Sequence, residues 1–293
     1  MARILPYISG ENCFALKGGT AINLFVRELP RMSVDIDLVY VPLEDRKTSL
    51  QGISTALGRI AAHIRKTIPG ISVMPSTFSG LEASPKLFIR KDGLLVKVEP
   101  NTILRGLLFP ARAMSFSASA EKLFNMSASV PVVSLADLYG GKLCAALDRQ
   151  HPRDLFDIKL LLDNEGITGD IRKAFVIYLA GHDRTMCDLL DPALKDIKPD
   201  YEGEFQGMTI TDVPLSALRN VQKKLAPMIL QAMTDNEKQF LISFKQGEPQ
   251  WELMGIPNLE TLPALRWKQL NIKKMDKARH KAQLDKLKKV LVA

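Results

Sequence analysis

Alternation of hydrophobic and polar residues dominates the first half of the chain. Residues 33–41 (SVDIDLVYV) alternate and are rich in β-branched side chains, which predicts a strand. Residues 86–100 (KLFIRKDGLLVKVEP) alternate on both sides of Asp92-Gly93, which predicts a β-hairpin with its turn at these two residues. Residues 49–67 (SLQGISTALGRIAAHIRKT) have the spacing of an amphipathic helix. This half therefore predicts strands that pair into a sheet, together with at least one covering helix.

The pattern changes to helical spacing near the middle of the chain. Residues 113–133 still predict strand and loop, but Ser134 is followed three residues later by an acid, which marks a helix start. Pro152 predicts the start of another helix, because proline is tolerated in a first helical turn. We expect an α+β protein with two domains: a mixed β-sheet domain with flanking helices at residues 1–130, and a mainly α-helical domain at residues 131–293.

Two acids interrupt the apolar strand predicted at residues 33–41. Asp35 and Asp37 are two positions apart, so their side chains project from the same face of the strand. Aligned carboxylates repel each other, and a hard cation such as Mg²⁺, which prefers carboxylate and phosphate oxygens, is their natural partner. Glu99, on the polar face of the second hairpin strand, is a candidate third ligand. Such a carboxylate set predicts metal-assisted displacement at phosphorus.

A glycine turn precedes these acids. Gly18, Gly19 and Thr20 lead into residues 20–29, whose spacing predicts a helix that Pro30 ends. Glycine lets the backbone approach a ligand closely, and the N–H groups at a helix start bind anions. A glycine turn beside paired acids therefore predicts a nucleoside triphosphate (NTP) site and nucleotidyl transfer.

The composition is that of an ordinary globular protein, with 293 residues, 46% hydrophobic and 25% charged. The sequence shows no apolar run that would cross a membrane and no signal-peptide pattern, so we expect a cytoplasmic protein. The three cysteines and four histidines are scattered without the spacing of a disulfide framework or a zinc site.

Positive charge is concentrated at the C-terminal end. Residues 266–293 hold ten Lys and Arg against two Asp, which accounts for the whole net charge of +8. One interpretation is contact with phosphates of nucleic acid. The other is a solvated helix surface whose apolar residues pack inward. Those apolar residues are Ile272, Met275, Ala282, Leu284, Leu287 and Leu291. The two interpretations are compatible.

The chain resembles the AbiEii toxin family of bacterial type IV toxin–antitoxin and abortive-infection systems, within the nucleotidyltransferase superfamily of DNA polymerase β type. The resemblance rests, in chain order, on KGGTAINL and RMSVDIDLVY, on VKVE, on LADLYGGKLCAALDRQHPRDLFDI and on LPALRWKQLNIKKM. It covers nearly the whole chain. It implies an N-terminal nucleotidyltransferase catalytic domain and a helical domain that contributes Lys142 and Asp157 to the site.

The resemblance also implies roles for individual positions. The implied nucleotide-binding residues are Gly18, Gly19, Thr20, Ser33, Lys142 and Arg153; the implied metal ligands are Asp35, Asp37 and, more loosely, Glu99; the implied catalytic residues are Asp35, Asp37, Lys142 and Asp157. From the residues alone, Lys142 lies among apolar neighbours, where a lysine is costly without an anionic partner, although it can also extend its ammonium to the surface. Asp154 fits a structural role at a helix start, as a partner of Arg153.

Three hypotheses for the function follow. The first is a toxin that uses Mg²⁺ or Mn²⁺ to transfer a nucleoside monophosphate from an NTP to the tRNA 3′ end, which blocks translation. The resemblance implies a cognate antitoxin, encoded elsewhere and acting without stable binding, and phosphorylation of Ser33 would repel the acids. The second is a nucleotidyl- or phosphotransferase that acts on a small hydroxyl compound or on protein. The third is an inactive RNA- or partner-binding module, against which the intact acids argue.

Overall fold

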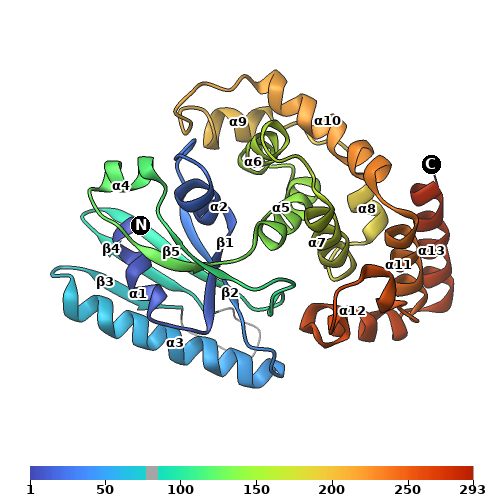
Figure 1. Ribbon diagram of the computed structural model, residues 1–293, viewed down its shortest axis with the longest axis horizontal. Helices are drawn as coiled ribbons and strands as arrows, with labels where there is room; N and C mark the ends of the chain where they lie inside the picture. Colours follow the sequence, from blue (N-terminus) through green and yellow to red (C-terminus); the bar gives the residue numbers. More distant parts are fainter. Residues whose placement is uncertain (77–84, 293) are drawn as a thin grey trace. The chain divides into compact units, whose positions relative to one another are not determined.

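The computed structural model describes residues 1–76 and 85–292 (Figure 1). Its contacts divide the chain into two compact units, Met1–Ser134 and Leu135–Ala293. Strands are found in the first unit, and the described part of the second is built of helices and connecting loops. Among the described residues, no helix combines the length and the apolar character needed to cross a membrane.

The N-terminal unit is built on a mixed sheet. Its described residues form seven strands in the order β3-β4-β5-β2-β1-β7-β6. Strand β2 lies near the centre, antiparallel to β1 and parallel to β5. The strands are β1 (Phe14–Lys17), β2 (Asp35–Tyr40), β3 (Ser72–Pro75), β4 (Leu87–Lys91), β5 (Leu94–Asn101), β6 (Arg112–Ser115) and β7 (Ser129–Val132). The predicted strand at residues 33–41 is therefore confirmed as β2.

Short and long helices accompany this sheet. They are η1 (Ala2–Ile4), α1 (Leu5–Ser9), α2 (Gly18–Ala21), η2 (Ile22–Val26), α3 (Arg46–Thr67) and α4 (Ala118–Phe124). The amphipathic helix α3 buries Ile53, Ile60 and Ile64 and packs against β3 and α1 (Figure 1). It begins three residues before the predicted start because the Asp45 carboxylate accepts hydrogen bonds from two backbone N–H groups of its first turn.

The predicted hairpin is confirmed, whereas the short helices α1 and α4 were not predicted. Strands β4 and β5 pair directly through Asp92 and Gly93, which both have positive φ, 50° and 78°, as a type I′ turn requires. Helix α4 lies where the sequence predicted strand and loop. Its seven residues are too few to display a helical period, and its main stabilising feature is the Ser117 side chain, which accepts a hydrogen bond from the Ala120 N–H group.

The C-terminal unit is helical throughout its described residues. Its elements are α5 (Leu135–Arg149), α6 (Pro152–Asp163), α7 (Gly169–Ala180), α8 (Met186–Leu190), α9 (Lys198–Glu204), α10 (Leu215–Ala232), α11 (Asp235–Gln246), η3 (Trp251–Met254), η4 (Leu259–Thr261), α12 (Pro263–Lys273) and α13 (Lys277–Val292). The α5–α7 packing is close because Gly140 has no side chain; a Cβ there would lie 2.7 Å from the Ala174 Cβ. Pro152 opens α6, as predicted.

The basic C-terminal segment forms α12 and α13. Ile272, Leu287 and Leu291 are buried, which confirms that apolar residues of this segment pack inward. Ala282 is exposed, so its predicted inward position is wrong; the buried stripe of α13 is narrower than the sequence pattern indicated. Lysines and arginines cover much of the remaining surface of both helices.

Candidate functional site

The glycine turn places backbone directly against the acidic strand. Strand β1 ends at Lys17, and Gly18 follows with a φ of 70°, which favours glycine. A Cβ at Gly18 would lie 2.1 Å from Asp37 Oδ2, and one at Gly19 would lie 2.7 Å from Arg31 Nη2. Gly18 therefore requires glycine for its backbone conformation and for space, whereas a Cβ at Gly19 would meet the end of the flexible Arg31 side chain. The close approach to Asp37 is built into the turn.

Buried hydroxyl groups join this turn to β2. Thr20 is fully buried, and its hydroxyl donates a hydrogen bond to the backbone carbonyl of Asp35. The same hydroxyl lies 2.8 Å from Ser33 Oγ. Thr20 thus stabilises the start of β2, while backbone N–H groups of the turn remain the features that suit an anion.

The acids share one face of the sheet. Ile36 and Leu38 are fully buried, so Asp35 and Asp37 project from the opposite, partly exposed face of β2. The parallel pairing of β2 with β5 sets Asp37 directly opposite Glu99. The structure therefore brings Asp35, Asp37 and Glu99 to the same side of neighbouring strands, as the strand periodicity predicted.

Glu99 is engaged by a lysine. Its carboxylate lies 3.1 Å from Lys86 Nζ, and the described residues contain no group of three or more His, Cys, Asp or Glu side chains arranged to hold a metal ion. Mg²⁺ is commonly held by one or two carboxylates together with substrate phosphates. Asp35 and Asp37 fit that donor set. Glu99 as a further ligand stays a prediction and requires Lys86 to move away.

Adding a methyl group at Gly18 is expected to displace Asp37. Gly18→Ala should lower the free energy of unfolding by about 1–2 kcal/mol for the positive φ and by a further ~1–3 kcal/mol for the contact with Asp37. Gly93→Ala is the matched control, because Gly93 has a φ of 78° but no atom within 4 Å of an added Cβ. Chemical denaturation measures both variants. Equal losses would contradict the close approach of Gly18 to Asp37.

The second set of predicted residues meets in the C-terminal unit, at the junction of α5 and α6. Lys142 Nζ lies 2.9 Å from Asp154 Oδ1 and 3.0 Å from Asp157 Oδ2. All three side chains are buried, and Asp157 is fully so. Arg149, at the end of α5, adds a contact of 2.8 Å to Asp154 Oδ2. The anionic partner that a buried Lys142 requires is thus supplied by the chain itself; a contact of Lys142 with nucleotide phosphates stays a prediction.

The predicted pairing of Asp154 with Arg153 is wrong. Adjacent residues of a helix do not face each other, and Arg153 instead reaches Glu204, 3.5 Å away. Burial alone would raise the pKa of the Asp154 carboxyl, but the charges of Lys142 and Arg149 outweigh burial and lower the pKa to about 2. Asp154 therefore has the structural role that the sequence predicted, with different partners.

This lowered pKa predicts a loss of stability in acid. Because the pKa of Asp154 falls from 3.8 to about 2 on folding, its ionised form contributes about 2 kcal/mol at neutral pH. The contribution is complete above about pH 5, decreases as the pH falls through 3.8, and disappears only below a pH of about 2, where the carboxyl is protonated in both states. Urea denaturation between these pH values should show that the free energy of unfolding decreases less with falling pH for Asp154→Asn than for the wild type. Parallel curves would contradict the prediction.

Three charged residues of these clusters were not identified from the sequence. Lys86 reaches Glu99 only through the hairpin, and Arg31 contacts the glycine turn across a loop, so neither has a local signal. Arg149 lies five residues before Asp154, across a helix–helix turn. Arg149 is the exception, because a basic residue just before the helix start predicted at Pro152 is a usable signal.

The chain matches one family of known proteins and the fold of a solved nucleotidyltransferase toxin. The family model described as "Nucleotidyl transferase AbiEii toxin, Type IV TA system" matches residues 1–268. MenT4, a nucleotidyltransferase toxin from Mycobacterium tuberculosis H37Rv, matches in structure with a TM-score of 0.62 and 17% identity, over 90% of this chain and 89% of that chain. Terminal uridylyl transferase 4 from Trypanosoma brucei with bound dUTP gives a TM-score of 0.29 and 12% identity, over 82% and 70%. No curated protein matches significantly in sequence. The predicted α+β class and family resemblance are confirmed.

Proposed function

The chain belongs to the AbiEii family of nucleotidyltransferase toxins of type IV toxin–antitoxin systems, and we propose that it transfers a nucleoside monophosphate from an NTP to the 3′ end of tRNA. Family membership makes it a nucleotidyltransferase with an NTP as substrate and a cognate antitoxin. The observation that supports the site is the contact between the glycine turn and the acidic face of β2, where Asp37 lies against Gly18. The tRNA acceptor and the use of a divalent metal ion are proposals.

Asp35 and Asp37 would hold the divalent cation, Mg²⁺ or Mn²⁺. When bound, such an ion polarises a phosphoryl oxygen and neutralises charge that develops on the phosphates. The glycine turn contributes its backbone N–H groups to the phosphates, because no side chain at Gly18 or Gly19 stands in the way. Thr20 and Ser33 keep the turn and the start of β2 together.

The reaction is an in-line displacement at the α-phosphorus of the NTP. The acceptor hydroxyl oxygen forms the new bond to phosphorus, the bond between the α-phosphorus and the bridging oxygen breaks, and pyrophosphate leaves. The hydroxyl proton passes to the carboxylate pair of β2, which is partly exposed and suited to act as a general base. One nucleotide is thereby joined to the acceptor through a phosphodiester bond.

The α5–α6 cluster is proposed to serve the same reaction. Asp157 and Lys142 hold each other in a buried pair, which fixes the start of α6. Arg153, at the start of α6, is more accessible than Lys142, with 26% of its side chain exposed against 8%, and is proposed to meet nucleotide phosphates. A contact of Lys142 with phosphate would require it to exchange one of its two carboxylate partners.

The basic segment at residues 266–293 is proposed to contact RNA. Its ten Lys and Arg residues supply the phosphate contacts that make RNA binding sensitive to salt. Addition of a nucleotide to the tRNA 3′ end would prevent aminoacylation and stop translation. The cognate antitoxin is proposed to act without stable binding to this chain.

Radiolabel transfer tests this function. The protein is incubated with total bacterial tRNA, Mg²⁺ and each α-labelled NTP in turn, beside tRNA whose 3′ diol has been destroyed with periodate. We expect label from at least one NTP on intact tRNA only. Absence of label on RNA from every NTP would overturn the tRNA acceptor. Label on protein or on a small compound would instead establish a nucleotidyltransferase with a different acceptor.

A further inference from the structure

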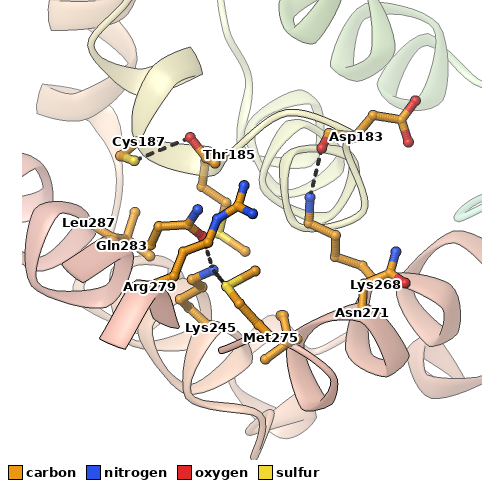
Figure 2. Close-up of a pocket in the computed structure, with 12 residues that line it drawn as sticks. Asp183, Thr185, Cys187, Lys245, Lys268, Asn271, Met275, Arg279, Gln283 and Leu287 are labelled. Atoms are coloured by element: carbon orange, nitrogen blue, oxygen red, sulfur yellow. Dashed lines mark hydrogen bonds between the residues drawn. The ribbon is translucent and has the colours of Figure 1, made fainter. Parts of the chain in front are cut away.

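A pocket of about 170 Å³ lies within the C-terminal unit, among α8, α11, α12 and α13 (Figure 2). It contains none of the residues assigned above to nucleotidyl transfer. Three cationic side chains line it, from three different helices: Lys245 of α11, Lys268 of α12 and Arg279 of α13. Gln283 of α13 also lines it. Lys268 and Arg279 belong to the basic segment proposed above to contact RNA, but no lining residue takes part in the transfer step itself.

Lys245 is buried without an opposite charge. Lys245 is 7% exposed. Its Nζ donates a hydrogen bond to Gln283 Oε1 at 2.6 Å, and the Met275 sulfur lies 3.9 Å away (Figure 2). Within residues 1–76 and 85–292, it forms no ion pair with a carboxylate. A buried ammonium is costly unless an anion balances it, and a neutral amide supplies only part of that balance.

The other two cations increase this imbalance. Lys268 Nζ donates hydrogen bonds to the backbone carbonyls of His182, Asp183 and Arg184, so its charge is solvated by neutral groups of the chain. Arg279 is exposed at the pocket's edge, and its guanidinium has no hydrogen-bond or ion-pair partner in the described part of the chain. It also stands in the first turn of α13, where the helix dipole is already positive.

The three cations are close enough to affect one another. Burial, and then the charge of Arg279, lower the pKa of Lys245. Burial, and then the charge of Lys245, lower the pKa of Lys268. The one acidic residue among the described lining residues is Asp183, and its carboxylate points away from the other labelled side chains (Figure 2). The charge of Asp183 partly opposes the lowering of the Lys268 pKa. The excess positive charge of the pocket is therefore concentrated at Lys245 and Arg279.

We propose that this pocket binds a phosphate group, with Lys245 at its base and Arg279 at its mouth. A cavity of roughly 150 Å³ holds a molecule as large as benzene, so 170 Å³ accommodates a phosphate with a small substituent. The guanidinium of Arg279 has donors in the fork that matches two phosphate oxygens, and Lys245 has N–H donors beyond the one given to Gln283. A phosphate dianion also balances more of the charge than a carboxylate does.

This phosphate comes either from free phosphate or from the terminal phosphate of a nucleic acid. The site is tested by calorimetric titration of the full chain with inorganic phosphate, without NTP or divalent cation, at constant ionic strength maintained with chloride. Lys245→Met keeps the length of the side chain and removes the ammonium. We expect it to weaken phosphate binding by about ten- to a hundredfold, the value of a charged hydrogen bond, and Arg279→Gln to weaken it by about tenfold.

Lys224→Met is the matched control, because Lys224 is exposed on α10, outside both the pocket and the basic segment. It should bind phosphate as the wild type does. Thermal unfolding without phosphate establishes that each variant is folded. Competition between inorganic phosphate and short RNAs with or without a 5′-phosphate separates the two sources. Undetectable binding by the wild type, or equal binding by the wild type and Lys245→Met, would overturn the proposal.

Discussion

Asp35→Asn is expected to abolish nucleotidyl transfer, with a rate at least about a thousandfold below that of the wild type. A metal ion at a phosphoryl group contributes several kcal/mol to the transition state, and about 1.4 kcal/mol corresponds to a factor of ten. Removal of one of the two carboxylates on the face of β2 removes most of that contribution. The backbone carbonyl of Asp35, which accepts the Thr20 hydrogen bond, is unchanged, so we expect the sheet to form normally.

The comparison that isolates this effect is Asp92→Asn. Asp92 is exposed in the hairpin turn of the same unit, at a φ of 50°, which asparagine adopts readily. The Asp92→Asn variant makes the same chemical change in the turn before β5, five residues before Lys97, which pairs with Asp35. Label transfer to tRNA should be normal in Asp92→Asn and absent in Asp35→Asn, with equal thermal unfolding midpoints. Full activity of a folded Asp35→Asn variant would remove β2 from the proposed active site.

Lys142→Met is expected to cause the largest loss of stability, about 3–5 kcal/mol, the cost of removing one partner from a buried ion pair. Asp154 retains Arg149 as a partner, but the fully buried Asp157 loses the ammonium 3.0 Å away. The cost arises from the carboxylate left behind rather than from the lost contact. We therefore expect the double variant Lys142→Met/Asp157→Leu to recover much of the loss, because apolar side chains then replace both members of the buried ion pair.

Denaturant unfolding of the two single variants and the double variant forms a cycle that measures this coupling. Lys159→Met is the control, since Lys159 forms an i,i+4 ion pair with Asp163 at the surface of α6, the helix that holds Asp157. It should change the free energy of unfolding by less than about 1 kcal/mol. If the double variant is less stable than Lys142→Met, the charge of Asp157 is not the source of the loss.

Local patterns were sufficient for much of the fold. The alternation in β2 and in the hairpin, and the period of α3, are properties of consecutive residues, so the sequence alone predicts these elements. Helix α4 was missed because seven residues hold too little pattern, and its Ser117 cap is one residue among many serines. The narrow buried stripe of α13 depends on which neighbours cover it, so Ala282 was misplaced.

In the candidate site, too, some features follow from local sequence spacing and others depend on contacts between distant segments. The shared face of Asp35 and Asp37 follows from spacing alone. The pairing of Glu99 with Lys86, and of Asp154 with Lys142 and Arg149, depends on cross-strand and helix–helix contacts that no short segment encodes. The sequence therefore predicts which groups are candidates for the chemistry, while the structure shows which charged side chains contact them.

The position of β1 has a consequence for synthesis of the chain. Strand β1 lies between β2 and β7, and its residue Leu16 pairs with Val132. At about 5–20 residues per second, β7 emerges from the ribosome several seconds after the acidic strand. Until then, β1 has an unpaired edge, which is the kind of surface that aggregates. We therefore expect a chain truncated before β7 to expose this edge of β1 and to aggregate more readily than the full chain.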